Sequence, residues 1–68
     1  MELNWVDGFE ISVRIESGRT VISANREGLI SLANHLKSLA EKPSGSHIHL
    51  DAYNSLEEGS SELILETI

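Results

Sequence analysis

A two-residue alternation near the N-terminus is the feature that most constrains the fold. Phe9, Ile11, Val13 and Ile15 are apolar, and one polar residue separates each from the next. Because successive side chains of a β-strand point to opposite faces, this period places the apolar set on one face. Residues 9–16 are therefore predicted to form a strand with one buried face and one solvated face.

A second strand is predicted directly after a tight turn. Residues 16–19 include Gly18, which readily adopts the positive φ that two-residue hairpin turns require. Residues 20–24 are then rich in β-branched side chains, which favour strands. We expect the two strands to pair as an antiparallel hairpin.

An amphipathic helix is predicted over residues 25–41. Asn25 is a natural N-cap, and Pro43 cannot continue a helix. Gly28 costs about 1 kcal/mol relative to alanine in a helix, so it indicates close backbone packing near the helix start. Apolar residues at three- and four-residue spacing form one stripe, which we expect to be buried. The stripe consists of Leu29, Leu32, Ala33, Leu36, Leu39 and Ala40.

Two further strands are predicted in the C-terminal part, at residues 47–50 and 62–68. Ile48 and Leu50 would lie on one face of the third strand. The expected class is α+β, with a small antiparallel four-stranded sheet and one helix packed on one face, in the order β-β-α-β-β. A chain of 68 residues has room for one core, so residues 1–68 are expected to form a single α+β domain.

The charge balance excludes some classes of partner. Eleven acidic residues face five basic ones, giving a net charge of −6. This balance opposes binding to nucleic acid or anionic lipid and permits electrostatic steering toward a basic protein partner. Taken alone, the net charge is explained more simply as keeping a small domain soluble. No segment approaches the roughly 20 apolar residues of a membrane span, and there is no cysteine. We therefore expect a cytoplasmic protein without a cofactor.

The acidic residues are concentrated at the C-terminal end. Residues 51–68 contain five of them and no Lys or Arg, which predicts an acidic face. Tyr53 is expected to be exposed near this face, whereas Trp5 is expected to cap the core. The predicted partner-binding residues are Asp51, Tyr53, Glu57, Glu58, Glu62 and Glu66.

His47, His49 and Asp51 raise the possibility of a metal site. Side chains two residues apart on a strand point the same way, and imidazole and carboxylate groups bind zinc or iron. His35 could complete such a site. The favoured interpretation is an exposed polar face opposite Ile48. Because nucleophile motifs and phosphate-binding glycine loops are absent, we do not expect an enzyme.

Three segments carry a resemblance to a known family. They are Ile-Ser-Ala-Asn-Arg-Glu-Gly-Leu at residues 22–29, Ser-His-Ile-His-Leu-Asp at residues 46–51, and Leu-Glu-Glu-Gly-Ser-Ser-Glu-Leu-Ile at residues 56–64. Together they resemble the immunity protein 32-type family of bacterial polymorphic toxin systems. The resemblance implies an α+β protein that neutralises a toxin by binding, without catalytic residues. The matching positions are His47, His49, Asp51, Glu57, Gly59 and Glu62.

Three functions follow from these observations. The first is an immunity-type protein that binds and neutralises a cognate toxin, with its acidic face on a basic groove of the toxin domain. The second is a generic protein-interaction or regulatory module. The third is a small metal-binding protein that uses the His-x-His-x-Asp strand. A homodimer is also compatible with the sequence, because a small sheet with an uncovered edge or face gains burial by pairing with itself.

Overall fold

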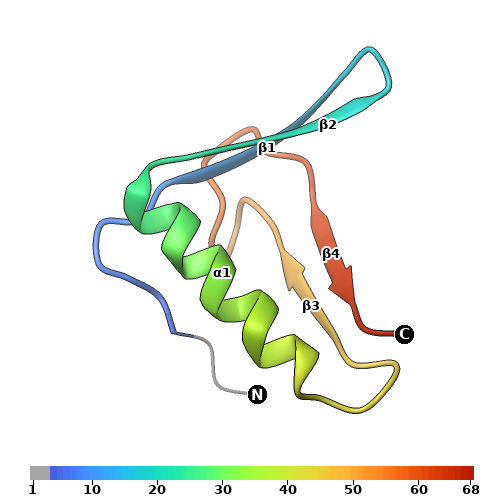
Figure 1. The fold of residues 1–68 in the computed structure, drawn as a ribbon. Helices are drawn as coiled ribbons and strands as arrows, with labels where there is room; N and C mark the ends of the chain where they lie inside the picture. Colours follow the sequence, from blue (N-terminus) through green and yellow to red (C-terminus); the bar gives the residue numbers. More distant parts are fainter. Residues whose placement is uncertain (1–3) are drawn as a thin grey trace.

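The computed structural model describes residues 4–68, which form two antiparallel strand pairs and one helix (Figure 1). The α+β class and the β-β-α-β-β order predicted from the sequence are confirmed. Within the described part of the chain, no helix has the length and apolar character that crossing a membrane requires. The elements are β1 (Ile11–Glu16), β2 (Arg19–Ala24), α1 (Arg26–Ala40), β3 (His47–Leu50) and β4 (Leu63–Glu66).

β1 and β2 form the predicted hairpin. They pair in antiparallel register, with Ile11 opposite Ala24 at the base. At the turn, Ser17 and Gly18 have φ values of 50° and 78°. Positive φ at both turn residues matches the twist of a two-residue hairpin, which explains the tight connection. The base of β1 is buried, whereas the tip of the hairpin projects away from the rest of the fold (Figure 1).

Asn25 determines where α1 begins. Its Oδ1 accepts hydrogen bonds from the backbone N–H of Gly28 at 2.8 Å and of Glu10 at 3.0 Å. Its Nδ2 donates to the carbonyl oxygen of Gly8 at 2.9 Å. One side chain therefore caps the helix, as predicted, and also holds the segment before β1 against it.

Gly28 allows the start of α1 to lie directly against the base of the hairpin. A Cβ at this position would stand 2.5 Å from the carbonyl oxygen of Glu10, 2.9 Å from Cγ1 of Ile11 and 3.0 Å from Cβ of Ala24. All three distances are too short for ordinary contact. The close backbone packing expected from this glycine is confirmed.

The buried side of α1 differs from the predicted stripe. Only Leu32 and Leu39 of that stripe are buried, and the other four members are exposed. The contact at Gly28 explains the difference, because it fixes the rotation of the helix about its axis. Each residue advances about 100° around an α-helix, so Leu29, Ala33, Leu36 and Ala40, which each follow a buried residue, are turned toward water. The buried residues of α1 are Gly28, Ser31, Leu32, His35 and Leu39.

The four strands are divided between two two-stranded sheets, whereas the sequence led us to expect one four-stranded sheet. β1 pairs with β2 and β3 pairs with β4. In the second pair, Ile48 lies opposite Leu65, and Leu50 lies opposite Leu63. The inward faces of both sheets contribute to the same hydrophobic core.

The connection between β3 and β4 occupies the edge of β1 that a third strand would need. The backbone N–H groups of Glu57 and Ser61 donate to the carbonyl oxygens of Ile11 and Val13, both at 2.8 Å. The Ser60 hydroxyl accepts a hydrogen bond from the Val13 N–H at 3.1 Å. Because these backbone groups of β1 are already bound, the hairpin gains no further strand along this part of its edge.

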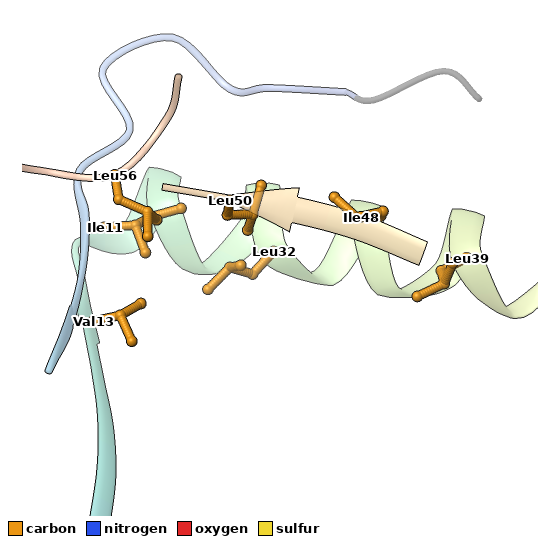
Figure 2. Packing of buried hydrophobic residues seen from close by; sticks show 7 residues of the cluster. All are labelled: Ile11, Val13, Leu32, Leu39, Ile48, Leu50 and Leu56. Atoms are coloured by element: carbon orange, nitrogen blue, oxygen red, sulfur yellow. The ribbon is translucent and has the colours of Figure 1, made fainter. Parts of the chain in front are cut away.

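The hydrophobic core lies between α1, β3 and the base of β1 (Figure 2). Trp5 and Phe9 pack at its periphery, with their ring centroids 4.4 Å apart. The expected position of Trp5 as a cap on the core is confirmed. The buried cluster consists of Ile11, Val13, Leu32, Leu39, Ile48, Leu50 and Leu56.

Candidate functional site

The outward face of the β3–β4 sheet carries both strand histidines and two of the predicted acidic residues. His47 lies opposite Glu66, and His49 lies opposite Ile64, which is 52% exposed. The His49 Nδ1 is 3.3 Å from the Glu62 Oε2. Both members of this pair are about half exposed, so their attraction is weak and the carboxylate remains accessible. The face therefore combines exposed carboxylates with an apolar side chain at its centre.

Asp51 organises the loop that follows β3. Its Oδ1 accepts hydrogen bonds from the backbone N–H groups of Tyr53 at 2.9 Å and Asn54 at 3.1 Å. Its carbonyl oxygen accepts one from the Leu56 N–H at 2.8 Å. The carboxylate is thus engaged within its own loop. The same loop presents Tyr53, which is 98% exposed, as the sequence led us to expect.

Glu57 and Glu58 lie in the connection that runs beside the base of the hairpin, and both are exposed. Glu57 lines an open pocket of about 280 Å³ together with Glu10. Ser12 and Ser23 line the same pocket. The Arg14 guanidinium donates to the Ser23 hydroxyl at 2.8 Å, so one basic side chain of this chain already lies at the pocket wall. Glu10 and Glu57 give the pocket two acidic lining residues, which suit a further guanidinium or ammonium group.

Three of the five predicted acidic residues therefore fall into two groups. Glu62 and Glu66 belong to the outward face of β3–β4, and Glu57 belongs to the pocket at the hairpin base. We call these the strand face (His47, His49, Glu62, Ile64 and Glu66) and the hairpin pocket (Glu10, Ser12, Ser23 and Glu57). No Lys or Arg occurs in residues 51–68, which contain Glu57, Glu62 and Glu66.

The residues considered for a metal site do not converge. Among residues 4–68, no three His, Cys, Asp or Glu side chains form a group that could hold a metal ion. The rings of His47 and His49 are adjacent, with centroids 4.9 Å apart, but the Asp51 carboxylate is bound within its loop. His35 lies on the buried side of α1 and makes an edge-to-face contact with Trp5, with centroids 4.0 Å apart.

His35 is a core residue with an unusual environment. It is fully buried, and no hydrogen bond to either ring nitrogen is present in the described part of the chain. Burial lowers the pKa of His35 below its ordinary value of 6.5, because the charged form loses solvation. The side chain is therefore neutral at physiological pH and acts as an aromatic packing group for Trp5.

Sequence reasoning did not single out Glu10 and Ile64 as surface residues of interest. Glu10 lines the same pocket as Glu57 because the connection after β3 lies along β1, which no local pattern reveals. Ile64 lies between two leucines, so the sequence shows no alternation of apolar and polar residues that would indicate which way its side chain points. Its outward direction follows from its pairing with His49, which is itself exposed.

Comparison with known proteins gives one positive result. Neither the curated proteins nor the solved structures contain a significant match. The family model described as Immunity protein 32 matches residues 19–68, from β2 through β4. This region is well over half of the chain and includes both outward histidines, Tyr53 and the predicted acidic residues. The chain therefore belongs to the Immunity protein 32 family.

Proposed function

We propose that this protein binds a cognate bacterial toxin and neutralises it in the cytoplasm of the producing cell. Membership of the Immunity protein 32 family supports an immunity role. Immunity proteins are generally not catalysts, so binding to the toxin is the expected means of neutralisation. The observation that supports a specific mode of binding is the exposed acidic surface beside Tyr53.

The strand face supplies the electrostatic part of the interaction. Glu62 and Glu66 are exposed, and Ile64 between them offers an apolar contact. On this proposal the toxin domain presents a basic groove, and the carboxylates occupy it in place of the toxin's own anionic substrate. Association would be fast at low salt and slower as salt screens the charges.

Tyr53 supplies the anchor. Tyrosine is enriched among residues that dominate binding energy, and here almost the entire residue is exposed. The hydrogen bonds from the Tyr53 and Asn54 backbones to Asp51 hold the loop in one conformation. A preorganised loop loses less conformational entropy on binding, so the proposed role of Asp51 is to position Tyr53.

The hairpin pocket adds a second contact. Glu10 and Glu57 would receive one Arg or Lys side chain of the toxin, with Ser12 and Ser23 beside it. The pocket lies at the base of the hairpin, whereas the strand face belongs to the other sheet. A toxin that contacts both surfaces would therefore bind across both two-stranded sheets.

Charge reversal with a matched control tests the proposal. Replacing two glutamates with lysine changes the net charge from −6 to −2, because each replacement adds two positive charges. We compare Glu62→Lys/Glu66→Lys with Asp7→Lys/Glu16→Lys, which makes the same change in net charge at exposed positions before β1 and at the hairpin tip. Calorimetry with the purified cognate toxin domain, at low and high salt, measures the affinity of each protein.

We expect the strand-face variant to lose at least about tenfold more affinity than the control, with a weaker salt dependence. Growth of cells that express the toxin with each variant gives the corresponding functional result. Tyr53→Ala should weaken binding at both salt concentrations, because its contribution is not electrostatic. Equal affinities for the two charge variants would exclude the strand face as the contact. Failure of the unmodified protein to bind or protect would exclude the immunity function against that toxin.

A further inference from the structure

An apolar stripe runs along α1 on a side that the fold leaves open. Leu29 and Leu36 are 56% and 50% exposed, and Ala33 and Ala40 are exposed as well. Their spacing of four, three and four residues places them on one side of a helix with 3.6 residues per turn. We call these four residues the helix stripe. Both leucines are about half exposed, so the helix stripe offers apolar surface along the helix.

Two other sides of α1 are already occupied. β3 lies along one side, and the segment before β1 lies along another (Figure 1). The Val6 N–H donates to the Ser31 hydroxyl at 2.8 Å, and the Asn34 Nδ2 donates to the Asn4 carbonyl oxygen at 3.1 Å. Neither Ser31 nor Asn34 belongs to the helix stripe. The stripe is therefore a separate surface, distinct from the core side and from the strand face.

The helix stripe is complementary to itself. In an antiparallel pair related by a two-fold axis between residues 34 and 35, Leu29 of one copy faces Ala40 of the other. Ala33 of one copy likewise faces Leu36 of the other. Each large side chain thus meets a small one, and this alternation lets facing helices interdigitate closely.

Charges at the ends of α1 fit the same arrangement. Arg26 and Glu41 are exposed at opposite ends of the helix and lie about 60° apart around its axis, because fifteen positions separate them. In the antiparallel pair, Arg26 of one copy lies beside Glu41 of the other. It also lies beside the C-terminal end of that helix, where the dipole favours a positive charge. The stripe itself contains no charged residue.

We propose that two copies of this protein form an antiparallel two-fold dimer through the helix stripe. The strand face and Tyr53 lie on other elements and remain available to a toxin. α1 has 15 residues and is therefore about 22 Å long. A contact along one such helix falls short of the roughly 800 Å² per partner that stable interfaces bury. The dimer is therefore expected to dissociate on dilution.

Sedimentation equilibrium of the purified chain, from low micromolar to millimolar concentration, tests the dimer. We expect a monomer–dimer equilibrium for the unmodified protein. Leu36→Lys should raise the dissociation constant at least about a hundredfold, because two leucines are lost per dimer. Its circular dichroism and melting temperature should stay the same, since Leu36 is exposed in the monomer. The matched control is Ile64→Lys, which places the same charge on the strand face and should leave the dimer intact.

Exchange of the facing residues tests the specific register. Ala33→Leu alone brings two leucines into opposition and should weaken the dimer, although it adds apolar surface. The double variant Ala33→Leu/Leu36→Ala restores one large and one small residue at each contact and should recover the dimer. Arg26→Glu should weaken association, and Arg26→Glu/Glu41→Arg should restore it.

Three outcomes would overturn the dimer proposal. The unmodified protein could remain monomeric at every concentration. Ile64→Lys could abolish the dimer while Leu36→Lys leaves it unchanged, which would place the interface on the strand face. Ala33→Leu could strengthen association, which would indicate unspecific hydrophobic contact. The first and third outcomes do not decide the toxin-binding proposal, because that proposal is tested on Glu62, Glu66 and Tyr53.

Discussion

Gly28→Ala is a substitution for which helix propensity and tertiary packing make opposite predictions. Alanine favours a helix over glycine by about 1 kcal/mol, so propensity alone predicts a more stable protein. In the folded structure, however, the added Cβ would stand 2.5 Å from the Glu10 carbonyl oxygen and 2.9 Å from the Ile11 side chain. The carbonyl belongs to the backbone and cannot rotate away from the new atom. We therefore expect packing to outweigh propensity.

The magnitude follows from the distance that must be recovered. Ordinary contact begins at 3.4 Å, so α1 or the segment before β1 must move by about 1 Å. Overpacking of this kind costs roughly 1–3 kcal/mol, and a backbone obstacle places Gly28→Ala at about 2–3 kcal/mol. After the gain in helix propensity, the net loss is about 1–2 kcal/mol. For a domain of this size, that loss corresponds to a fall of about 4–16 °C in melting temperature.

Urea and thermal unfolding followed by circular dichroism measure this loss. The control compares Lys37→Ala with Lys37→Gly, an exchange between alanine and glycine at an exposed position of the same helix. There, alanine should be the more stable residue by about 1 kcal/mol. At position 28 we expect the opposite order of stability, with glycine more stable than alanine. A Gly28→Ala protein as stable as the unmodified one, or more stable, would refute it.

Three more substitutions test the buried histidine, the helix cap and the loop. Because burial holds the pKa of His35 below 6.5, the unfolded chain binds more protons than the folded chain at acidic pH. Stability should therefore fall as pH drops from about 8 to 5, and His35→Leu should remove that part of the fall in urea unfolding at each pH. Asn25→Ala removes the helix cap and two hydrogen bonds to the preceding segment, so we expect the free energy of unfolding to fall by about 1–2 kcal/mol in thermal unfolding. An unchanged stability would refute the role of the cap. Asp51→Ala should cost about 1–2 kcal/mol and speed amide exchange at Tyr53, and unchanged exchange would show that the carboxylate does not order the loop.

Local patterns were sufficient to predict the elements of this fold. The alternation from Phe9 to Ile15 and the turn at Gly18 predict a hairpin, and the structure contains it. Asn25 marks the helix start in both sequence and structure. Each of these signals depends on neighbouring residues only, so a single sequence contains the information.

The arrangement of the elements depends on contacts between distant residues, which periodicity does not reveal. The rotation of α1 is fixed where Gly28 meets Glu10, and this contact turns Leu29 and Leu36 toward solvent. The division into two sheets arises because Glu57 and Ser61 bond to β1. Neither contact leaves a trace in the spacing of apolar residues.

The candidate site was predictable to a similar extent. Composition placed the acidic residues at the C-terminal end, and Tyr53 is exposed as expected. The Asp51 carboxylate accepts a backbone hydrogen bond within its own loop. An aspartate at the start of a turn commonly does so, and this bond was therefore predictable from the local sequence. The contribution of Glu10 to the hairpin pocket was not predictable, because Glu10 and Glu57 are 47 positions apart in the sequence.

The hydrogen bonds between β1 and the connection after β3 have a consequence for folding kinetics. Val13 and Ser60 are 47 positions apart in sequence, so their bond closes a loop that includes most of the chain. The hairpin and the helix involve near neighbours and can form early, whereas this closure carries a large entropic cost and comes late. The transition state should therefore contain the hairpin and α1, with the connection still unattached. Substitutions at Ser60 would then accelerate unfolding while leaving the refolding rate almost unchanged.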